Sequence, residues 1–168
     1  MIFSGNIFEK RNFVLKNDKR EITFSKYGPE FKIDMKIKLK SYPSSGQFGN
    51  IFRVTAFGSN DGTKGDRYPA LFVHPNRHFH FTTCIANDPN QKTDSSTAVA
   101  LNRWYEISIE QRKSGSNIWS YQVYVNGKRL LSLVLNARPI HLRNAKLYLS
   151  DRFHEEAKVD FDYLRIFY

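Results

Sequence analysis

The sequence contains a single cysteine, Cys84, among its 168 residues. One thiol cannot form an intramolecular disulfide, so the fold must be stabilised by its core alone. A chain of this length can bury about two thirds of its unfolded surface, which is enough for one disulfide-free domain. We therefore expect a single domain over residues 1–168, in either a reducing or an oxidising compartment.

Long apolar runs are also missing. No segment approaches the roughly 18 apolar residues that span a bilayer, no secretory apolar core follows Met1, and no Asn-x-Ser/Thr acceptor is present. Met1 directly precedes an expected strand, which leaves a removed signal or an upstream domain open. We predict no transmembrane segment.

Acidic residues are fewer than basic ones. The sequence has 16 Asp and Glu and 26 Lys and Arg, which gives a net charge of +10. This excess favours anionic partners: sulfated or carboxylated glycans, acidic protein surfaces, nucleic acid or anionic lipid. A basic surface can also serve only solubility. The chain has no helix-turn-helix, no RNP-type strand pair and no zinc-finger spacing, so nucleic acid is not expected as a partner.

Helical periodicity is absent, and strand patterns take its place. Apolar and charged residues alternate without a break from Phe31 to Lys40. This alternation predicts a strand with one dry face and one wet face. The lysines of the wet face are either a basic stripe for an anionic polymer or a solvated face that discourages edge pairing.

The stretch Gly49–Ile85 is typical of three strands, the first two separated by the polar, glycine-marked loop 58–65. Further on, strands 119–125 and 131–135 flank Asn126-Gly127, a strong signal for a two-residue hairpin. Residues 87–96 read as a polar loop, and residues 151–156 as the one place for a helical turn. Near the start, apolar patches before and after the turn 17–20 indicate a first strand and a hairpin.

Some eleven or twelve short strands separated by turns predict an all-β fold, a two-sheet antiparallel jelly-roll sandwich. Loops on such a scaffold commonly carry binding residues. Tyr42 and Phe48 lie in the turn-rich loop 41–49, where no strand pattern requires them. Exposed rings there could stack on sugars, or fold back as loop plugs.

Arginines are spread over strands and loops that a jelly roll could bring to one rim, and their forked side chains bind carboxylate or sulfate at two points. With one lysine they are Arg53, Lys64, Arg67, Arg77, Arg103 and Arg129. Three histidines lie nearby at His74, His78 and His80. The His78-x-His80 spacing could hold zinc with His74, or simply place two imidazoles on a wet strand face.

The second half of the chain contains three segments that carry a resemblance: RWYEISI at 103–109, YQVYVNGK at 121–128 and AKVDFDYLRI at 157–166. In this layout the chain resembles the laminin G-like branch of the concanavalin A-like lectin/glucanase superfamily, over roughly residues 31–168. The resemblance implies a jelly roll with ligands at the loop rim or on the concave sheet. Its members include lectins, matrix modules, glycoside hydrolases and polysaccharide lyases, so fold alone does not choose a function.

The resemblance also implies what a site would contain. Relatives often hold calcium at the loop rim, for which Asn60, Asp61 and Asp66 are candidates, although Asp66 fits equally well as a structural acid. The hydrolase branch uses an E-x-D-x-x-E strand, which this sequence lacks; retaining chemistry needs two carboxyl groups about 5 Å apart. The lyase branch uses a clustered Arg, His and Tyr set, for which the candidates are Tyr68, Arg77, His78 and His80.

We therefore expect a non-catalytic recognition domain that binds an anionic glycan or an acidic protein surface in an extracellular or cell-surface setting. Its candidate ligand-binding residues are Tyr42, Phe48, Arg53, Arg67, His74, Arg77, His78 and His80. The alternatives are a polysaccharide-cleaving enzyme on the same scaffold and a structural module that self-associates. A cytoplasmic location and any oligomeric state remain open.

Overall fold

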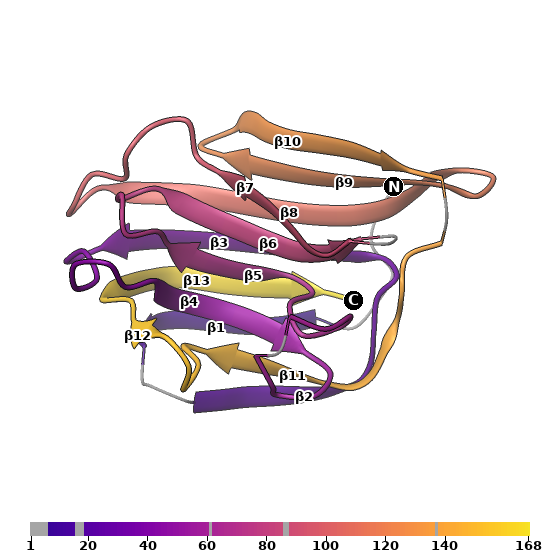
Figure 1. Ribbon diagram of the computed structural model, residues 1–168, viewed down its shortest axis with the longest axis horizontal. Helices are drawn as coiled ribbons and strands as arrows, with labels where there is room; N and C mark the ends of the chain where they lie inside the picture. Colours follow the sequence, from indigo (N-terminus) through magenta and orange to yellow (C-terminus); the bar gives the residue numbers. More distant parts are fainter. Residues whose placement is uncertain (1–6, 16–18, 61, 86–87, 137) are drawn as a thin grey trace.

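The computed structural model describes residues 7–15, 19–60, 62–85, 88–136 and 138–168, and over these residues it contains strands but no helix. Two antiparallel sheets stack as a sandwich, as the sequence predicts (Figure 1). The fold is an all-β jelly-roll sandwich. No helix in the described part of the chain has the length and apolarity to cross a membrane.

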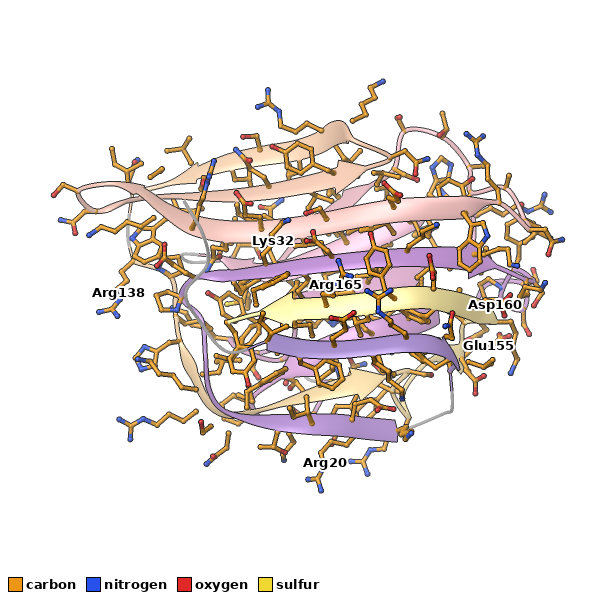
Figure 2. All side chains as sticks on the ribbon, turned by 180° about the vertical axis from the view of Figure 1, so that it is seen from behind. Arg20, Lys32, Arg138, Glu155, Asp160 and Arg165 are labelled. Carbon is orange, nitrogen blue, oxygen red and sulfur yellow. The ribbon has the colours of Figure 1, made fainter. Side chains whose placement is uncertain are left out.

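The six-stranded sheet lies behind in Figure 1 and in front in Figure 2. Its spatial order is β1 (Ile7–Val14), β13 (Val159–Phe167), β3 (Phe31–Leu39), β8 (Trp104–Gly115), β9 (Ile118–Val125) and β10 (Lys128–Leu135). The seven-stranded sheet runs β2 (Lys19–Tyr27), β11 (Leu142–Leu149), β4 (Gly49–Thr55), β5 (Ala70–Val73), β6 (Phe79–Ile85) and β7 (Asp88–Asp94). A short β12 (Glu155–Glu156) pairs in parallel with β4.

Strand β3 confirms the alternation that organises the fold. Its five apolar side chains are fully buried between the sheets, and the residues between them are half-buried on the outer face. Because β3 lies between β13 and β8, its lysines do not protect an edge. They lie instead among acids, with Lys32 Nζ 2.6 Å from Asp34, Lys36 Nζ 3.0 Å from Asp162, and Lys38 Nζ 3.2 Å from Asp160. The stripe is therefore largely neutralised, on the face that Figure 2 turns toward the viewer.

The hairpin predicted at Asn126-Gly127 is confirmed. Val125 faces Lys128 across the turn, and both turn residues have positive φ, 50° for Asn126 and 75° for Gly127. This conformation matches the right-handed twist of the flanking strands and favours an Asn-Gly pair.

The hairpin predicted near the start of the chain is wrong. Strand β1 pairs with β13 in one sheet, whereas β2 pairs with β11 in the other. The two apolar patches therefore belong to different sheets. In β1 the ring of Phe13 stacks on Phe161 at 4.3 Å, and in β2 Phe24 is buried against Tyr27 and Tyr168. Residues 2–6 and the turn residues 17–18 lie outside the described residues.

Two further expectations need correction. Most of the expected loop 87–96 is strand β7, which pairs with β6. Its side chains are too polar to show a period of two, because it is a sheet edge with no apolar face to bury. The helical turn expected over 151–156 is a tight turn followed by β12; the Asp151 carboxylate accepts hydrogen bonds from the N–H groups of Phe153 and His154.

Candidate binding groove on the outer face of the seven-stranded sheet

The outer face of the seven-stranded sheet is partly aromatic and basic. In β5 and β6 the side chains of Leu71, Val73, Phe79 and Phe81 belong to the core between the sheets. Since alternate residues of a strand point to opposite faces, the residues between them turn outward. Phe72 and His80 are such residues and face each other across β5 and β6, with ring centroids 6.1 Å apart.

Around this pair lies a hollow of about 260 Å³. We call it the histidine groove, lined by Phe48, Arg67, Phe72, His74, His80, Asn90, Lys92, Asp94 and His154. Its size is near the lower limit of small-molecule sites, which run from about 300 to 1,000 Å³. Four of the residues predicted to bind ligand therefore come together here, namely Phe48, Arg67, His74 and His80.

Phe48, from the loop between β3 and β4, forms the aromatic centre of the groove. Its ring lies 4.7 Å from that of His74 and 5.2 Å from that of His80, both edge to face. It also meets Phe72 at 6.2 Å. Edge-to-face packing of this kind fixes ring orientations. The loop ring predicted from sequence thus folds back onto the sheet and joins the groove wall.

His80 is held by a carboxylate. Its Nδ1 lies 2.5 Å from Oδ1 of Asp94 on the neighbouring strand β7. A neutral imidazole that donates from Nδ1 leaves Nε2 as an acceptor. Burial lowers the pKa of His80, and the hydrogen bond to Asp94 only partly offsets this effect. His80 is therefore mainly neutral near pH 7.

His154 repeats this arrangement from the opposite side. Its Nδ1 lies 2.8 Å from Oδ1 of Asp151, and its ring packs on Phe72 at 4.8 Å. Burial alone would raise the pKa of Asp151, but the hydrogen bond from His154 and the charge of Arg53 outweigh it and lower that pKa. Sequence reasoning missed His154 because the segment was expected to be a helical turn. The only signal was a histidine three residues after an aspartate.

Arg53 is buried rather than exposed at a rim, and it does not line the groove. Its side chain is 1% exposed, with Nε 3.5 Å from Asp151 Oδ2 and Nη1 donating to the Ser59 carbonyl at 2.9 Å. The first distance joins two charges without forming a hydrogen bond between them. Burial lowers the pKa of Arg53, and Asp151 opposes that shift. Arg53 can act on a ligand only by positioning the turn that carries His154.

Arg67 is the half-buried cation of the groove. Nη1 donates to Asn90 Oδ1 at 3.0 Å and Nη2 to Asn60 Oδ1 at 2.8 Å, while the guanidinium lies 5.6 Å from the centre of the Phe72 ring. Burial lowers the pKa of Arg67, opposed by Asp151 and Asp66. Among the described residues, its buried Nε has no hydrogen-bond partner. Its Nη groups are paired with neutral amide oxygens rather than with a carboxylate, so its positive charge is not neutralised by these partners.

The other predicted ligand-binding residues lie elsewhere. The exposed guanidinium of Arg77 stacks on Tyr42 at 4.7 Å, and the Tyr42 hydroxyl donates to the Val99 carbonyl at 2.8 Å. His78 Nδ1 lies 2.5 Å from the Ser95 carbonyl oxygen, so His78 is engaged away from His74 and His80. Tyr68, a lyase candidate, is fully buried and donates to the Ile140 carbonyl.

The calcium candidates are engaged with protein groups. Asp66 is fully buried and accepts from Ser59 Oγ at 2.6 Å, while the side-chain oxygen of Asn60 accepts from Arg67. Asp61 lies outside the described residues. Within the residues that the structure describes, no three His, Cys, Asp or Glu side chains are placed to hold a metal ion. Calcium at Asn60, Asp61 and Asp66 stays a prediction.

Comparison with known proteins identifies the fold. No protein-family profile and no curated sequence matches this chain. Alginate lyase Aly36B superposes with a TM-score of 0.60 at 12% identity, over 92% of this chain and 79% of the lyase. The protein named HCR/D-Sa-GBL1/C gives 0.58 at 13% identity, over 98% of this chain and 44% of that one. Trypanosoma rangeli sialidase in complex with sialic acid gives 0.56 at 12% identity, over 82% of this chain.

This chain spans only 20% of the length of the sialidase that it matches. A double mutant of Aly36B has been solved in complex with alginate tetrasaccharide, and this chain superposes on it with a TM-score of 0.59 at 14% identity. Identities this low establish the sandwich and no shared chemistry. The class defined here is therefore a jelly-roll β-sandwich; its laminin G-like character stays a prediction.

Proposed function

We propose that this chain is a non-catalytic recognition domain that binds a carboxylated glycan in the histidine groove. The observation that carries the proposal is Arg67, a half-buried guanidinium that lines the groove over Phe72 and forms no ion pair among the described residues. Guanidinium groups bind carboxylates through forked, charge-assisted hydrogen bonds.

The rest of the lining suits a sugar that carries a negative charge. Phe48 and Phe72 give an apolar floor, and Lys92 adds an exposed cation at the edge. Asn90 and the imidazoles supply donors and acceptors for hydroxyl groups. A few polar groups that converge on an aromatic floor are typical of small-ligand sites. The +10 net charge would draw a polyanion toward the domain.

The structural neighbours support this class of ligand without fixing it. Two of them were solved in complex with carboxylated sugars, alginate tetrasaccharide for the lyase and sialic acid for the sialidase. Carbohydrates of this kind are common on cell surfaces and in matrices. An extracellular or cell-surface setting therefore belongs to the proposal, as does an acidic protein surface as a second kind of partner.

Titration calorimetry with alginate tetrasaccharide and sialyllactose tests the proposal, with cellotetraose as the neutral control. We expect binding of at least one acidic sugar, and a loss of about tenfold or more in Arg67→Gln, since a hydrogen bond to a charged group is worth about 1.5–3 kcal/mol. Because Arg67 also holds Asn60 and Asn90, the exposed Lys92→Gln serves as a second variant. Arg77→Gln, outside the groove, is the matched control. Failure of every acidic sugar to bind would overturn the proposal.

One observation favours a second candidate, a polysaccharide-cleaving enzyme. His80 and His154 each hold Nδ1 against a carboxylate, which leaves Nε2 free to accept a proton in the same groove. A histidine oriented in this way is a common general base. Release of unsaturated or reducing ends from uronans, lost in both His80→Gln and His154→Gln, would establish catalysis; intact oligosaccharide after prolonged incubation would leave recognition as the function.

A further inference from the structure

A second hollow of about 790 Å³ lies between the 95–105 segment and the β9–β10 hairpin. We call it the hairpin cleft; it is lined by Ser95, Ser96, Thr97, Ala98, Ala100, Arg103, Tyr105, Val125, Asn126, Lys128, Arg129 and Leu130. It shares no lining residue with the histidine groove. Its volume falls within the range of about 300–1,000 Å³ that ligand sites occupy.

The charge of the hairpin cleft has one sign. Arg103, Lys128 and Arg129 are exposed, and no carboxylate belongs to the lining. Within the described part of the chain, none of these three cations forms an ion pair, in contrast to the lysines of β3. The guanidinium of Arg103 lies 5.8 Å from the centre of the Tyr105 ring. These cations are therefore available to acidic groups of another molecule.

After its first two residues, Lys128 and Arg129, strand β10 is an uncharged sheet edge. Its residues Leu130–Leu135 carry no charge, and among the described residues β10 pairs only with β9 (Figure 1). Val134 is 70% exposed on it. The other three edge strands, β1, β2 and β7, all carry several charged residues. Charges on an edge strand prevent unwanted pairing, so the uncharged stretch Leu130–Leu135 marks a place where another strand can add.

We propose that β10 and the hairpin cleft together bind an extended acidic segment of a partner protein. The segment adds as a strand along Leu130–Leu135, and its carboxylates reach Arg103, Lys128 and Arg129. Main-chain hydrogen bonds supply affinity in this mode, and side-chain pockets supply specificity. Because the cations lie at the start of β10, a segment that adds in parallel carries its acidic residues first and alternating apolar residues after them.

Charge decides between an acidic partner and a second copy of this chain. Antiparallel pairing of two β10 strands would bring together two molecules that each carry +10 and would place no acid opposite the cations. Because of this charge, the occupant is an acidic segment rather than a second copy of the chain. The six residues Leu130–Leu135 span about 20 Å at 3.3 Å per residue, so the segment is short.

Fluorescence anisotropy tests the proposal with a blocked synthetic peptide of three glutamates followed by six alternating valine and threonine residues. We expect saturable binding that weakens about tenfold in the triple variant Arg103→Gln, Lys128→Gln, Arg129→Gln, because several exposed charge pairs are lost together. Two further peptides carry N-methyl groups on alternate amides, one set on each edge. Only the peptide whose N-methyl groups face β10 should fail to bind. When the unmodified peptide is bound, the backbone amides of residues 130–135 should be protected from hydrogen exchange.

Four results would overturn the proposal. Equal binding of a scrambled peptide would show only charge attraction, and equal binding of both methylated peptides would exclude strand addition. Sedimentation that shows a β10-mediated dimer, with no peptide bound, would assign the edge to a second copy. Loss of acidic-sugar binding in the triple variant would assign the cleft to glycan. Arg67→Gln should leave peptide binding unchanged, which keeps this test separate from the proposed function of the histidine groove.

Discussion

The guanidinium Nε of Arg53 and the Oδ2 of Asp151 lie 3.5 Å apart, and each side chain is 1% exposed. Through this pair the central strand β4 holds the turn that places His154 against Phe72. A buried ion pair contributes little net stability compared with an apolar pair, but loss of one partner leaves an uncompensated charge.

Asp151→Asn should therefore lower the free energy of unfolding by about 3–5 kcal/mol, because Arg53 stays buried without a counter-charge. Urea unfolding at neutral pH measures the change. Asp160→Asn is the matched control, since it removes a carboxylate of a partly exposed pair with Lys38 and should have a far smaller effect. Equal effects of the two substitutions would contradict the role given to the buried pair.

The pH dependence of stability should carry a contribution from Asp151. Its pKa is lower in the fold than in the unfolded chain, so the unfolded state binds more protons as the carboxyl titrates. The contribution is present above the unfolded pKa of about 3.9 and is lost as the pH falls through the folded pKa. Urea midpoints between about pH 5 and pH 2 should fall less steeply in Asp151→Asn than in the native chain. An unchanged slope would show that the pKa of Asp151 is the same in the folded and unfolded states.

His80 should titrate in the opposite sense to a salt-bridged histidine. Because burial lowers its pKa, the fold prefers the neutral ring, and stability drops as the pH falls from about 6.5 through the folded pKa. A bound carboxylate would favour the charged ring, so binding of an acidic sugar should take up a proton and strengthen toward pH 5. Calorimetry in two buffers of different ionisation enthalpy counts that proton.

The uptake should disappear in His80→Gln and persist in His78→Gln, whose side chain faces Ser95 instead. If proton uptake remains in His80→Gln, the group that takes up the proton is another residue of the groove.

At Gly127 the β9–β10 turn should depend on the backbone conformation of the residue rather than on side-chain contacts. Gly127 has φ 75°, and an added Cβ would meet no heavy atom within 4 Å. Gly127→Ala should therefore cost about 1–2 kcal/mol, the penalty for an L-residue in the left-handed region. Thermal unfolding measures it, with Lys128→Ala as the control at the neighbouring position of normal φ. No loss of stability would mean that the turn changes its type.

Local sequence patterns predicted the strands well, but they did not predict which strands pair with each other. The alternation in β3 and the Asn126-Gly127 turn each act between neighbours in sequence, so they can be recognised without the rest of the chain. The pairing of β1 with β13 joins residues 146 to 160 positions apart in sequence, such as Ile7 and Phe167, and no local sequence window contains both partners. Strand β7 was missed because its backbone pairing leaves no apolar pattern in its side chains.

The same limit applies to the site. Phe48, Arg67, His74 and His80 were recognised as chemistry-bearing residues, and the sheet brings them together. Arg53 was assigned to a rim because sequence does not show which strand lies at the centre of a sheet. His154 is about 70 residues away from His80 in sequence and joins it only through the turn that Asp151 and Arg53 hold.

The antiparallel register of β1 and β13 places Ile7 beside Phe167. A stretching force applied at these two residues would break the residue pairs between β1 and β13 one after another from this end. It would not shear all the pairs at the same time. The sandwich should thus yield at low tension along this seam, with β1 peeling away before the strands of the histidine groove bear any load.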